Sequence, residues 1–209
     1  MLGLLIIFAV VMGDTFFTIK SPSEGIYKEK MSKFLAFAFP VGSAAEAKDY
    51  ISDFQKRYYD ARHVCWAYMI GADRTEFQSN DNGEPSGTAG KPILGQINSF
   101  GLTNVVIIVV RYFGGIKLGT SGLIVAYREA AKEALAAADV IECHETEDVS
   151  FTFPYLAMND VMRLCKGGDV EIIGQVFDNS CEMTLRVRRD HAEGLIKRLG
   201  DIDGVVVKK

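Results

Sequence analysis

Two glycine-dense segments hold most of the residues that could do chemistry. The first runs from Asp81 to Pro92 and the second from Phe113 to Gly122. Glycine lets the backbone approach a ligand closely, and a loop that leads into a helix start presents free N–H groups with partial positive charge. Lys91, Arg111 and Lys117 would add formal positive charge beside those helix starts. Together the segments predict a surface that binds an anion.

Neither segment fits a known nucleotide-binding motif. A P-loop needs glycine where the first segment has Pro85, and Ser or Thr where it has Pro92. The dinucleotide fingerprint needs glycine where the second segment has Lys117. We therefore predict an anion-binding or partner-binding surface without a cofactor.

The same residues also have a purely structural interpretation. In it the glycines only supply turns with positive φ, and Arg111 pairs with Glu84 or Asp81. Residue spacing alone does not separate this interpretation from the anion-binding surface. Where the segments lead into helices, Thr88 and Thr120 are predicted as N-caps.

Two rival functions stay open. Histidine is a common general acid or base, and Glu84 or Asp81 could orient His63, which would suit an enzyme acting on a small phosphorylated or peptide substrate. No nucleophile accompanies this acid/base group, because hydroxyl residues in glycine loops are typical of caps, and we expect a protein that is not an enzyme. The second rival is a protein-docking module anchored by Tyr112 and Phe113.

The cysteines indicate neither a metal site nor a disulfide framework. Cys65, Cys143, Cys165 and Cys181 form no C-x-x-C pair and have no paired histidines. Alternation in the segment from His63 to Tyr68 places Cys65 on one face of a strand, where a structural thiol is expected. Reduced thiols of this kind predict a reducing, cytoplasmic compartment.

The charge balance excludes a generally basic nucleic-acid binder. The chain has 209 residues, with 23 Lys and Arg against 27 Asp and Glu, a formal net charge of -4. No overall positive field then attracts RNA or an anionic membrane, so any such contact must come from a local patch with shallow salt dependence.

The first residues do not fit the rest of the chain. Met1–Met12 is uncharged and apolar, too short to span a bilayer and without the features of a signal peptide. We favour an upstream start codon with Met12 as the functional initiator, and an additional apolar strand or flap as the alternative.

Hydrophobic periodicity predicts the elements that would position the glycine segments. Strands are expected at Thr15–Ile19, Glu24–Lys28 and Lys33–Phe39 as a meander, at His63–Ile70 and Thr75–Ser79 as a hairpin, and at Asn104–Tyr112 as a central strand. Helices are expected at Ala44–Tyr58 after a capping box, near Thr88–Asn98, and at Leu123–Ala138.

The C-terminal part predicts a second module. After a polar linker at Glu142–Asp148, the order is strand, helix, strand, strand, helix, strand, which is typical of a ferredoxin-like βαββαβ module. The predicted elements are Val149–Phe153, Leu156–Lys166, Asp169–Phe177, Ser180–Val187, His191–Leu199 and Val205–Lys208. The fold class is therefore α+β, with domains at residues 13–141 and 145–209.

Arginines near the end of the strand Ser180–Val187 are secondary candidates for RNA contact. Arg186 and Arg188 share one face, with Arg189 beside them. The predicted sheet lacks the paired aromatic residues of an RNA-recognition sheet, so a solvated face is the competing interpretation. His144 in the linker and His191 near a helix start are expected to be solvated.

The two glycine segments together resemble a known family. The stretches NGEPSGTAGKP from Asn82 and VVRYFGGIKLGT from Val109, with Ala61-Arg62-His63 upstream, resemble the IMPACT family, in particular its bacterial YigZ-like members. The resemblance covers about residues 24–139, and the C-terminal module looks like the second domain of the bacterial members.

The resemblance implies a fold and a function. It implies that the first domain is similar to domain IV of elongation factor G and the second to its domain V. Eukaryotic relatives regulate translation by competing with the kinase of the amino-acid starvation response for its ribosome-associated activator. For a bacterial member this implies a cytoplasmic regulator that binds RNA, the ribosome or a translation-associated protein, without established catalysis or metal. We expect a monomer without a membrane partner.

The resemblance also implies a functional surface drawn from both glycine segments and from His63. Its residues are His63, Gly83, Glu84, Pro85, Gly87, Thr88, Gly90, Lys91, Arg111, Tyr112, Gly114, Gly115 and Gly119, to which the charge pattern adds Lys117. Asn82 stands where the family usually has Asp, which weakens a metal or paired-carboxylate role. Ser121 stands where it usually has Gly, which permits a cap but narrows the backbone conformations.

Overall fold

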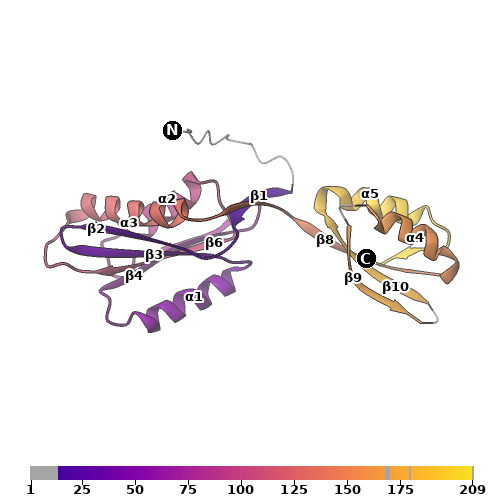
Figure 1. Ribbon diagram of the computed structural model, residues 1–209, viewed down its shortest axis with the longest axis horizontal. Helices are drawn as coiled ribbons and strands as arrows, with labels where there is room; N and C mark the ends of the chain where they lie inside the picture. Colours follow the sequence, from indigo (N-terminus) through magenta and orange to yellow (C-terminus); the bar gives the residue numbers. More distant parts are fainter. Residues whose placement is uncertain (1–13, 168–169, 179, 209) are drawn as a thin grey trace. The chain divides into compact units, whose positions relative to one another are not determined.

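The computed structural model describes residues 14–167, 170–178 and 180–208, which form a mixed α/β structure (Figure 1). These residues divide into two compact units, one of residues 16–143 and one of residues 144–208 together with Asp14 and Thr15. The apolar segment Met1–Met12 and the proposed initiator Met12 lie outside the described residues. Within the described part of the chain, no helix is long and apolar enough to cross a membrane.

A five-stranded antiparallel sheet forms the centre of the first unit. Its order is β2-β3-β6-β4-β5, with β2 at Ser23–Glu29, β3 at Ser32–Pro40, β6 at Val105–Tyr112, β4 at His63–Ile70 and β5 at Glu76–Asn80. Residues 105–111 of β6 are buried on both faces, which confirms the central strand expected from its β-branched run. The predicted β4–β5 hairpin is also confirmed.

Helices cover both faces of this sheet (Figure 1). On one face α1, at Ala44–Arg57, packs Phe54 into a cluster with Trp66 and Ile108. On the other face α2, at Gly90–Ser99, and α3, at Gly119–Ala136, bury their apolar sides against the sheet. The predicted capping box is confirmed, because the Ser43 hydroxyl accepts from the Glu46 N–H at 3.2 Å.

Three expectations for the first unit were wrong. The strand β1, at Thr15–Ile19, does not continue a meander into β2 but pairs with β7, at Val140–His144. The helix α3 begins at Gly119, four residues before the predicted Leu123, so part of the expected glycine loop is helical. The predicted linker at 142–148 does contain the boundary between the two units, after Cys143, but it is the end of β7 and the start of β8 and not an irregular segment, since polar side chains also suit solvent-facing strands.

The second unit is a four-stranded antiparallel sheet with two helices on one face (Figure 1). Its elements are β8 at Thr146–Phe153, a short 3₁₀ turn at Tyr155–Ala157, α4 at Met158–Cys165, β9 at Val170–Phe177, β10 at Cys181–Arg188, α5 at Arg189–Gly200 and β11 at Val206–Val207. The sheet order is β11-β8-β10-β9. Alternate residues of β8 and β10, among them Phe151 and Met183, form the core with Leu195 of α5.

Candidate functional site

The carboxylate of Asp81 organises the first glycine segment. Its Oδ2 accepts from the Gly87 N–H at 2.7 Å, and its Oδ1 accepts from the N–H groups of Ala89 and Gly90 at 2.9 and 2.8 Å. Partial burial would raise the pKa of Asp81, but these three backbone donors outweigh it and hold the pKa below its usual range. The partial positive charge at the N-terminus of α2 is therefore already compensated by the Asp81 carboxylate.

The predicted threonine caps were wrong. The hydroxyl of Thr88 donates to the Pro85 carbonyl at 2.6 Å, and the N-cap position of α2 is Ala89, which makes no side-chain cap bond. Thr120 lies inside the first turn of α3. The N-cap position of that helix is Leu118, whose side chain makes no capping hydrogen bond. Asp81 instead accepts from the N–H groups at the start of α2, the role expected of Thr88. It does so from eight and nine residues before the donors, whereas an ordinary N-cap side chain accepts from two or three residues ahead.

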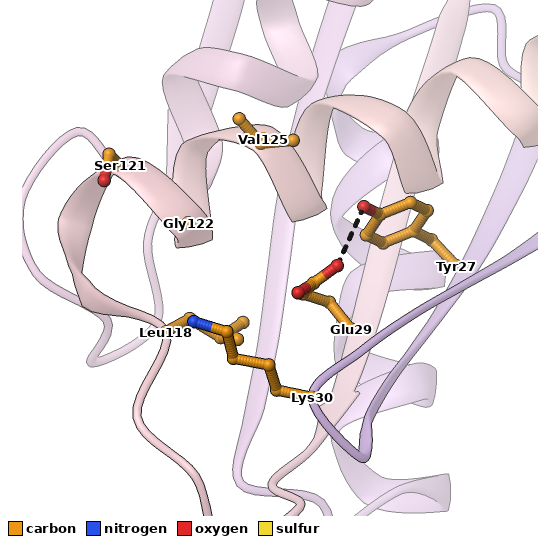
Figure 2. Close-up of a pocket in the computed structure, with 7 residues that line it drawn as sticks. All are labelled: Tyr27, Glu29, Lys30, Leu118, Ser121, Gly122 and Val125. Atoms are coloured by element: carbon orange, nitrogen blue, oxygen red, sulfur yellow. Dashed lines mark hydrogen bonds between the residues drawn. The ribbon is translucent and has the colours of Figure 1, made fainter.

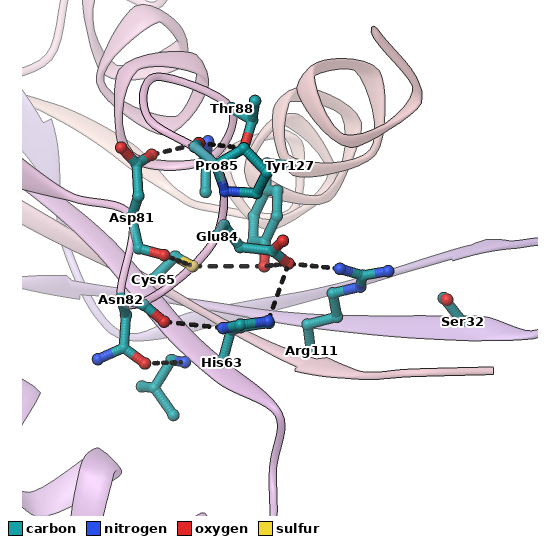
Figure 3. A network of polar contacts seen from close by, with 12 residues as sticks. Ser32, His63, Cys65, Asp81, Asn82, Glu84, Pro85, Thr88, Arg111 and Tyr127 are labelled. Atoms are coloured by element: carbon teal, nitrogen blue, oxygen red, sulfur yellow. Dashed lines mark hydrogen bonds and ion pairs between the residues drawn. The ribbon is translucent and has the colours of Figure 1, made fainter. Parts of the chain in front are cut away.

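Glu84 is the centre of a buried polar network (Figure 3). Its Oε1 accepts from Arg111 Nη1 at 2.5 Å and from the Tyr127 hydroxyl at 2.8 Å, and His63 Nε2 lies 3.7 Å away. Sequence analysis missed Tyr127 because its position in α3 fits the apolar periodicity of a core residue. A tyrosine on a buried helix face needs a partner for its hydroxyl, and that requirement was the available signal.

Arg111 does not add free positive charge. It is buried, pairs with Glu84, and its guanidinium carbon lies 5.4 Å from the Phe34 ring centroid and 5.6 Å from that of Phe113. The Nε of Arg111 is buried without a hydrogen-bond partner among the described residues. The structure thus has the Arg111–Glu84 pair, one of the two pairs that the structural interpretation offered. Arg111 therefore does not supply the positive charge that the anion-binding interpretation expected of it.

His63 and Glu84 are brought together, as the acid/base hypothesis requires. The Nδ1 of His63 donates to the Asn82 carbonyl at 2.8 Å, because a carbonyl oxygen can only accept. The other ring nitrogen therefore faces Glu84, whose Oε1 already accepts from Arg111 and Tyr127. This arrangement holds His63 in place at the edge of the network.

The network contains no group suited to nucleophilic attack near neutral pH. Cys65 is buried, and its thiol donates to the Asp81 carbonyl at 3.0 Å and lies 3.3 Å from the Tyr127 hydroxyl. Burial raises the pKa of the Cys65 thiol to about 12. Burial likewise raises the pKa of Tyr127 far above its usual range. Cys65 is thus the structural thiol that the strand pattern predicted.

Asn82 has a structural role in the turn after β5. It adopts a left-handed conformation with φ of 43°, its Oδ1 accepts from the Val64 N–H at 2.9 Å, and its own N–H donates to Asn80 Oδ1 at 2.7 Å. Asparagine is among the side chains that tolerate this conformation best. No cluster of His, Cys, Asp and Glu side chains within the described ranges could hold a metal ion.

The second glycine segment lies tightly against the β2–β3 turn. A Cβ on Gly114 would lie 2.1 Å from the Met31 carbonyl carbon, so no other residue fits, and the Gly114 N–H donates to the Ser32 hydroxyl at 3.2 Å. Nearby, a hollow of about 300 Å³ separates the same turn from the first turns of α3, and Ser121 lies at its rim (Figure 2). Tyr27 and Glu29 line its opposite wall, where the tyrosine hydroxyl donates to the carboxylate at 3.4 Å.

The predicted surface residues divide by exposure. Gly83, Pro85, Lys91, Gly115, Lys117 and Gly119 are exposed; His63, Gly87, Tyr112 and Gly114 are half-buried; and Glu84, Thr88, Gly90 and Arg111 are buried. We call the exposed set Gly83, Pro85, Lys91, Gly115, Lys117 and Gly119 the glycine surface. Of the two docking anchors, Phe113 is 48% exposed, whereas the Tyr112 hydroxyl donates to Asp60 at 3.2 Å beside α1.

The three candidate arginines of the second unit all make ion pairs within it. Arg186 donates to both carboxylate oxygens of Asp148, at 2.9 and 3.1 Å, and Arg189 pairs with Glu145. Arg188 donates to the buried carboxylate of Asp14 at 3.1 and 3.3 Å. Arg186 and Arg189 are exposed, as the competing interpretation of a solvated face expected, whereas Arg188 is half-buried.

Asp14 is a further residue that sequence analysis missed. The Arg188 guanidinium holds the pKa of Asp14 at about 2. His144, expected to be solvated in a linker, is half-buried in β7 with its Nδ1 3.6 Å from Asp14 and 3.1 Å from the Thr15 hydroxyl. The pairing of β1 with β7 brings these residues together, and no local pattern in the sequence indicates it.

Comparison with known proteins identifies relatives of the first unit alone and relatives of most of the chain. Residues 30–135 match the model of the Impact N-terminal domain. Over 172 residues the chain is 31% identical to an IMPACT family member of Haemophilus influenzae, covering 81% of this chain and 84% of that protein. One crystal structure, described as that of a hypothetical protein, superposes with a TM-score of 0.72 at 26% identity, covering 93% of this chain and 96% of that one.

Two further relatives match over a shorter stretch. The chain is 39% identical over 131 residues to IMPACT family member YvyE of Bacillus subtilis, and 38% identical over 117 residues to IMPACT family member YigZ of Escherichia coli. These matches cover 63% and 55% of this chain, and they span 60% and 57% of the two relatives.

Proposed function

The chain belongs to the IMPACT family, and on that premise we propose that it is a cytoplasmic regulator of translation that binds RNA, the ribosome or a ribosomal partner through the glycine surface. One observation carries the proposal. Once the internal contacts of both segments, which the structure describes in full, are accounted for, the only charged side chains left exposed on them are the ammonium groups of Lys91 and Lys117, beside the exposed hydroxyls of Ser86, Thr120 and Ser121. Ammonium groups, hydroxyls and backbone N–H groups are the donors with which proteins contact phosphate.

The buried network supports this role by fixing the surface. Glu84 ties the first segment to the end of β6 through Arg111 and to α3 through Tyr127. Asp81 holds the same segment to the start of α2. A surface held in one conformation loses less entropy when a partner binds.

The domain arrangement belongs to the same proposal. We take residues 13–141 as a domain similar to domain IV of elongation factor G and residues 145–209 as a ferredoxin-like domain similar to its domain V. The sheet order β11-β8-β10-β9 supports the second assignment. The first and third strands of the module, β8 and β10, lie in the centre and the second and fourth, β9 and β11, lie at the edges, as in a ferredoxin-like βαββαβ module. A similarity to a ribosome-bound factor favours a translation-associated partner.

The test is binding of purified protein to ribosomes by sedimentation and to a fluorescent single-stranded RNA by anisotropy, at low salt. The double variant Lys91→Glu/Lys117→Glu should lose most of the binding, because it reverses both exposed charges of the glycine surface. Lys20→Glu, an equally exposed lysine of the same unit, should bind as the wild type does. Arg111→Glu is unsuitable, since it would bury two carboxylates side by side.

In the enzyme alternative His63 is needed for catalysis and not for binding. Hydrolysis or phosphotransfer that disappears in His63→Ala, while RNA and ribosome binding persists, would favour acid/base chemistry at the His63–Glu84 contact of 3.7 Å. Wild-type protein that binds neither RNA nor ribosomes at low salt would remove the proposed function.

A further inference from the structure

A groove between α1 and β5 lies outside the glycine surface. Its volume is about 430 Å³, and among the residues lining it are Lys48 and Ser52 of α1, Trp66 of β4, and Gln78, Asn80 and Asn82 on the strand side. We call it the amide groove. It is rich in polar side chains that the buried network does not use.

The amides form a row. Gln78 and Asn80 alternate along β5, in register with Tyr68 and Trp66 of β4, and Asn82 lines the groove from the turn that follows the strand. Side chains two residues apart on a strand repeat about every 6.8 Å. Because β5 is the edge of the sheet, the outer side of the row is open. The opposite wall is a helix face on which Lys48 and Ser52 stand one turn apart.

Backbone contacts fix which way two of these amides point. Asn82 Oδ1 accepts from the Val64 N–H at 2.9 Å, and Asn80 Oδ1 accepts from the Asn82 N–H at 2.7 Å. An N–H can only donate, so both oxygens are held toward the backbone and the NH₂ groups are left for other partners. The Gln78 Oε1 accepts from the Tyr68 hydroxyl at 3.0 Å, but a hydroxyl can also accept, so this contact does not by itself orient the amide. The two asparagines of the strand wall thus present donors to the groove.

The donors select a class of ligand. Amide NH₂ groups and the Lys48 ammonium need acceptors, to which the Ser52 hydroxyl can also donate, and the buried Trp66 contributes an apolar part of the lining against which a planar group can lie. An extended peptide carries an N–H donor for almost every carbonyl, which would leave donors facing donors. Adenine, cytosine and guanine each carry an exocyclic NH₂ group, which would face these donors with a further donor, whereas uracil carries two carbonyl oxygens and no exocyclic NH₂ group. The backbone phosphate supplies the anion for Lys48.

We propose that the amide groove binds single-stranded RNA with a preference for uracil, an inference that rests on the RNA-binding form of the proposed function. The groove meets the glycine surface at the end of β5, where Asn82 precedes Gly83 and its carbonyl accepts from His63 at 2.8 Å. Because α1 covers one face of the sheet and α2 and α3 cover the other, an RNA strand that contacts both regions must pass around this edge of the sheet.

The chain contains a built-in probe for this site, because Trp66 is its single tryptophan. Fluorescein-labelled decauridylate, decacytidylate and decaadenylate are titrated into the full chain, with anisotropy reporting any binding and Trp66 emission reporting occupation of the groove. We expect decauridylate to bind at least about tenfold more tightly than the other two and to change Trp66 emission.

Isosteric variants test the donors without removing the internal contacts. Asn80→Asp and Gln78→Glu keep the oxygens that accept from Asn82 and Tyr68 but replace the NH₂ groups by oxygen. Each should weaken decauridylate binding about tenfold and abolish the uracil preference. Gln175→Glu, which adds the same charge on the exposed strand β9 of the second unit, is the matched control and should bind as the wild type does.

The outcomes separate this inference from the function on which it rests. Anisotropy that shows binding, with unchanged Trp66 emission and no effect of Asn80→Asp, overturns the groove and leaves the glycine surface standing. Equal affinity for the three oligonucleotides also overturns it. A change in Trp66 emission with an unstructured Gly-Ser decapeptide but not with decauridylate assigns the groove to a peptide instead. No RNA binding by any readout removes this inference together with the RNA-binding form of the proposed function, and ribosome sedimentation then decides whether the rest of the proposed function stands.

Discussion

Glu84 and Arg111 form a buried ion pair to which Tyr127 adds a hydrogen bond. Removing one charge of such a pair leaves the other buried without compensation, which costs several kcal/mol. The pair therefore matters less as a source of net stability than as a constraint, because it allows one arrangement of the first glycine segment against β6 and α3. Its place in the molecule is structural support for the glycine surface.

Glu84→Gln should lower the free energy of unfolding by about 3 kcal/mol, because the Arg111 guanidinium stays buried without a counter-charge. Urea denaturation measures the change. Glu129→Gln is the control in the same unit: its partners Arg128 and Lys132 are exposed, so a loss of only about 0.5 kcal/mol is expected. A double variant, Glu84→Gln/Arg111→Met, should recover part of the loss, and equal losses for Glu84→Gln and Glu129→Gln would contradict the argument.

Asp81 gives a pH-dependent contribution to stability. Its native pKa lies below the unfolded value of about 3.9, so its stabilising effect is complete above that value and is lost as the pH falls through the native pKa. Asp81→Asn should lower the unfolding free energy by about 2 kcal/mol at pH 7, where three backbone donors lose a charged acceptor. The difference from wild type should shrink steadily below pH 4, and a difference that stays constant with pH would count against the charge.

At the scale of elements, Gly114 fixes the distance between the second glycine segment and the β2–β3 turn. Gly114→Ala should cost more than about 3 kcal/mol, because the added Cβ would lie 2.1 Å from a backbone atom of Met31 that cannot move aside. Gly95→Ala is the matched control: it lies within α2 with nothing inside 4 Å of the added Cβ, and it should stabilise the chain by about 0.5–1 kcal/mol. Thermal unfolding of both variants checks the pair, and a tolerated alanine at 114 would show that the turn can shift.

Elements with a strong local pattern were predictable, and those set by distant pairing were not. The β-branched run of β6 and the capping box of α1 identify themselves in the sequence, because burial on both faces and an N-terminal serine leave local traces. The pairing of β1 with β7 has no local pattern in the sequence. The residues of β1 therefore fit a meander, and the polar end of β7 from Glu142 fits a linker. The start of α3 was missed because Gly119 and Gly122 disguise a helical turn as loop.

The candidate site shows the same limit. The sequence placed His63, Glu84 and Arg111 together correctly but could not choose between an exposed anion site and a buried pair, since both use the same residue types. Tyr127 and the capping role of Asp81 were missed because each acts across a distance along the chain that no local motif records. The amide groove lay hidden for a related reason: its donors are recognisable only once the acceptors that hold their oxygens are known.

At the scale of the whole molecule, the net charge of -4 limits how RNA can be bound. A protein that neutralises Z phosphates of a single strand loses affinity with a slope of about -0.7Z when the logarithm of the binding constant is plotted against that of the salt concentration. With Arg111 and the arginines of the second unit occupied by carboxylates, the proposed contacts are those of Lys91, Lys117 and Lys48.

Three phosphate contacts predict a slope of about -2 for decauridylate, against about -7 for a basic protein with ten contacts. Fluorescence anisotropy at a series of KCl concentrations measures it. Removing Lys91 and Lys117 together should reduce the slope to about -0.7, and removing Lys48 alone should reduce it to about -1.4, because each lysine accounts for one phosphate. A wild-type slope steeper than about -4 would place RNA on lysines outside the glycine surface and the amide groove. Hydrogen bonds to uracil carbonyls release no counterions, so Asn80→Asp should weaken binding at every salt concentration by nearly the same factor, apart from the repulsion its new charge adds at low salt.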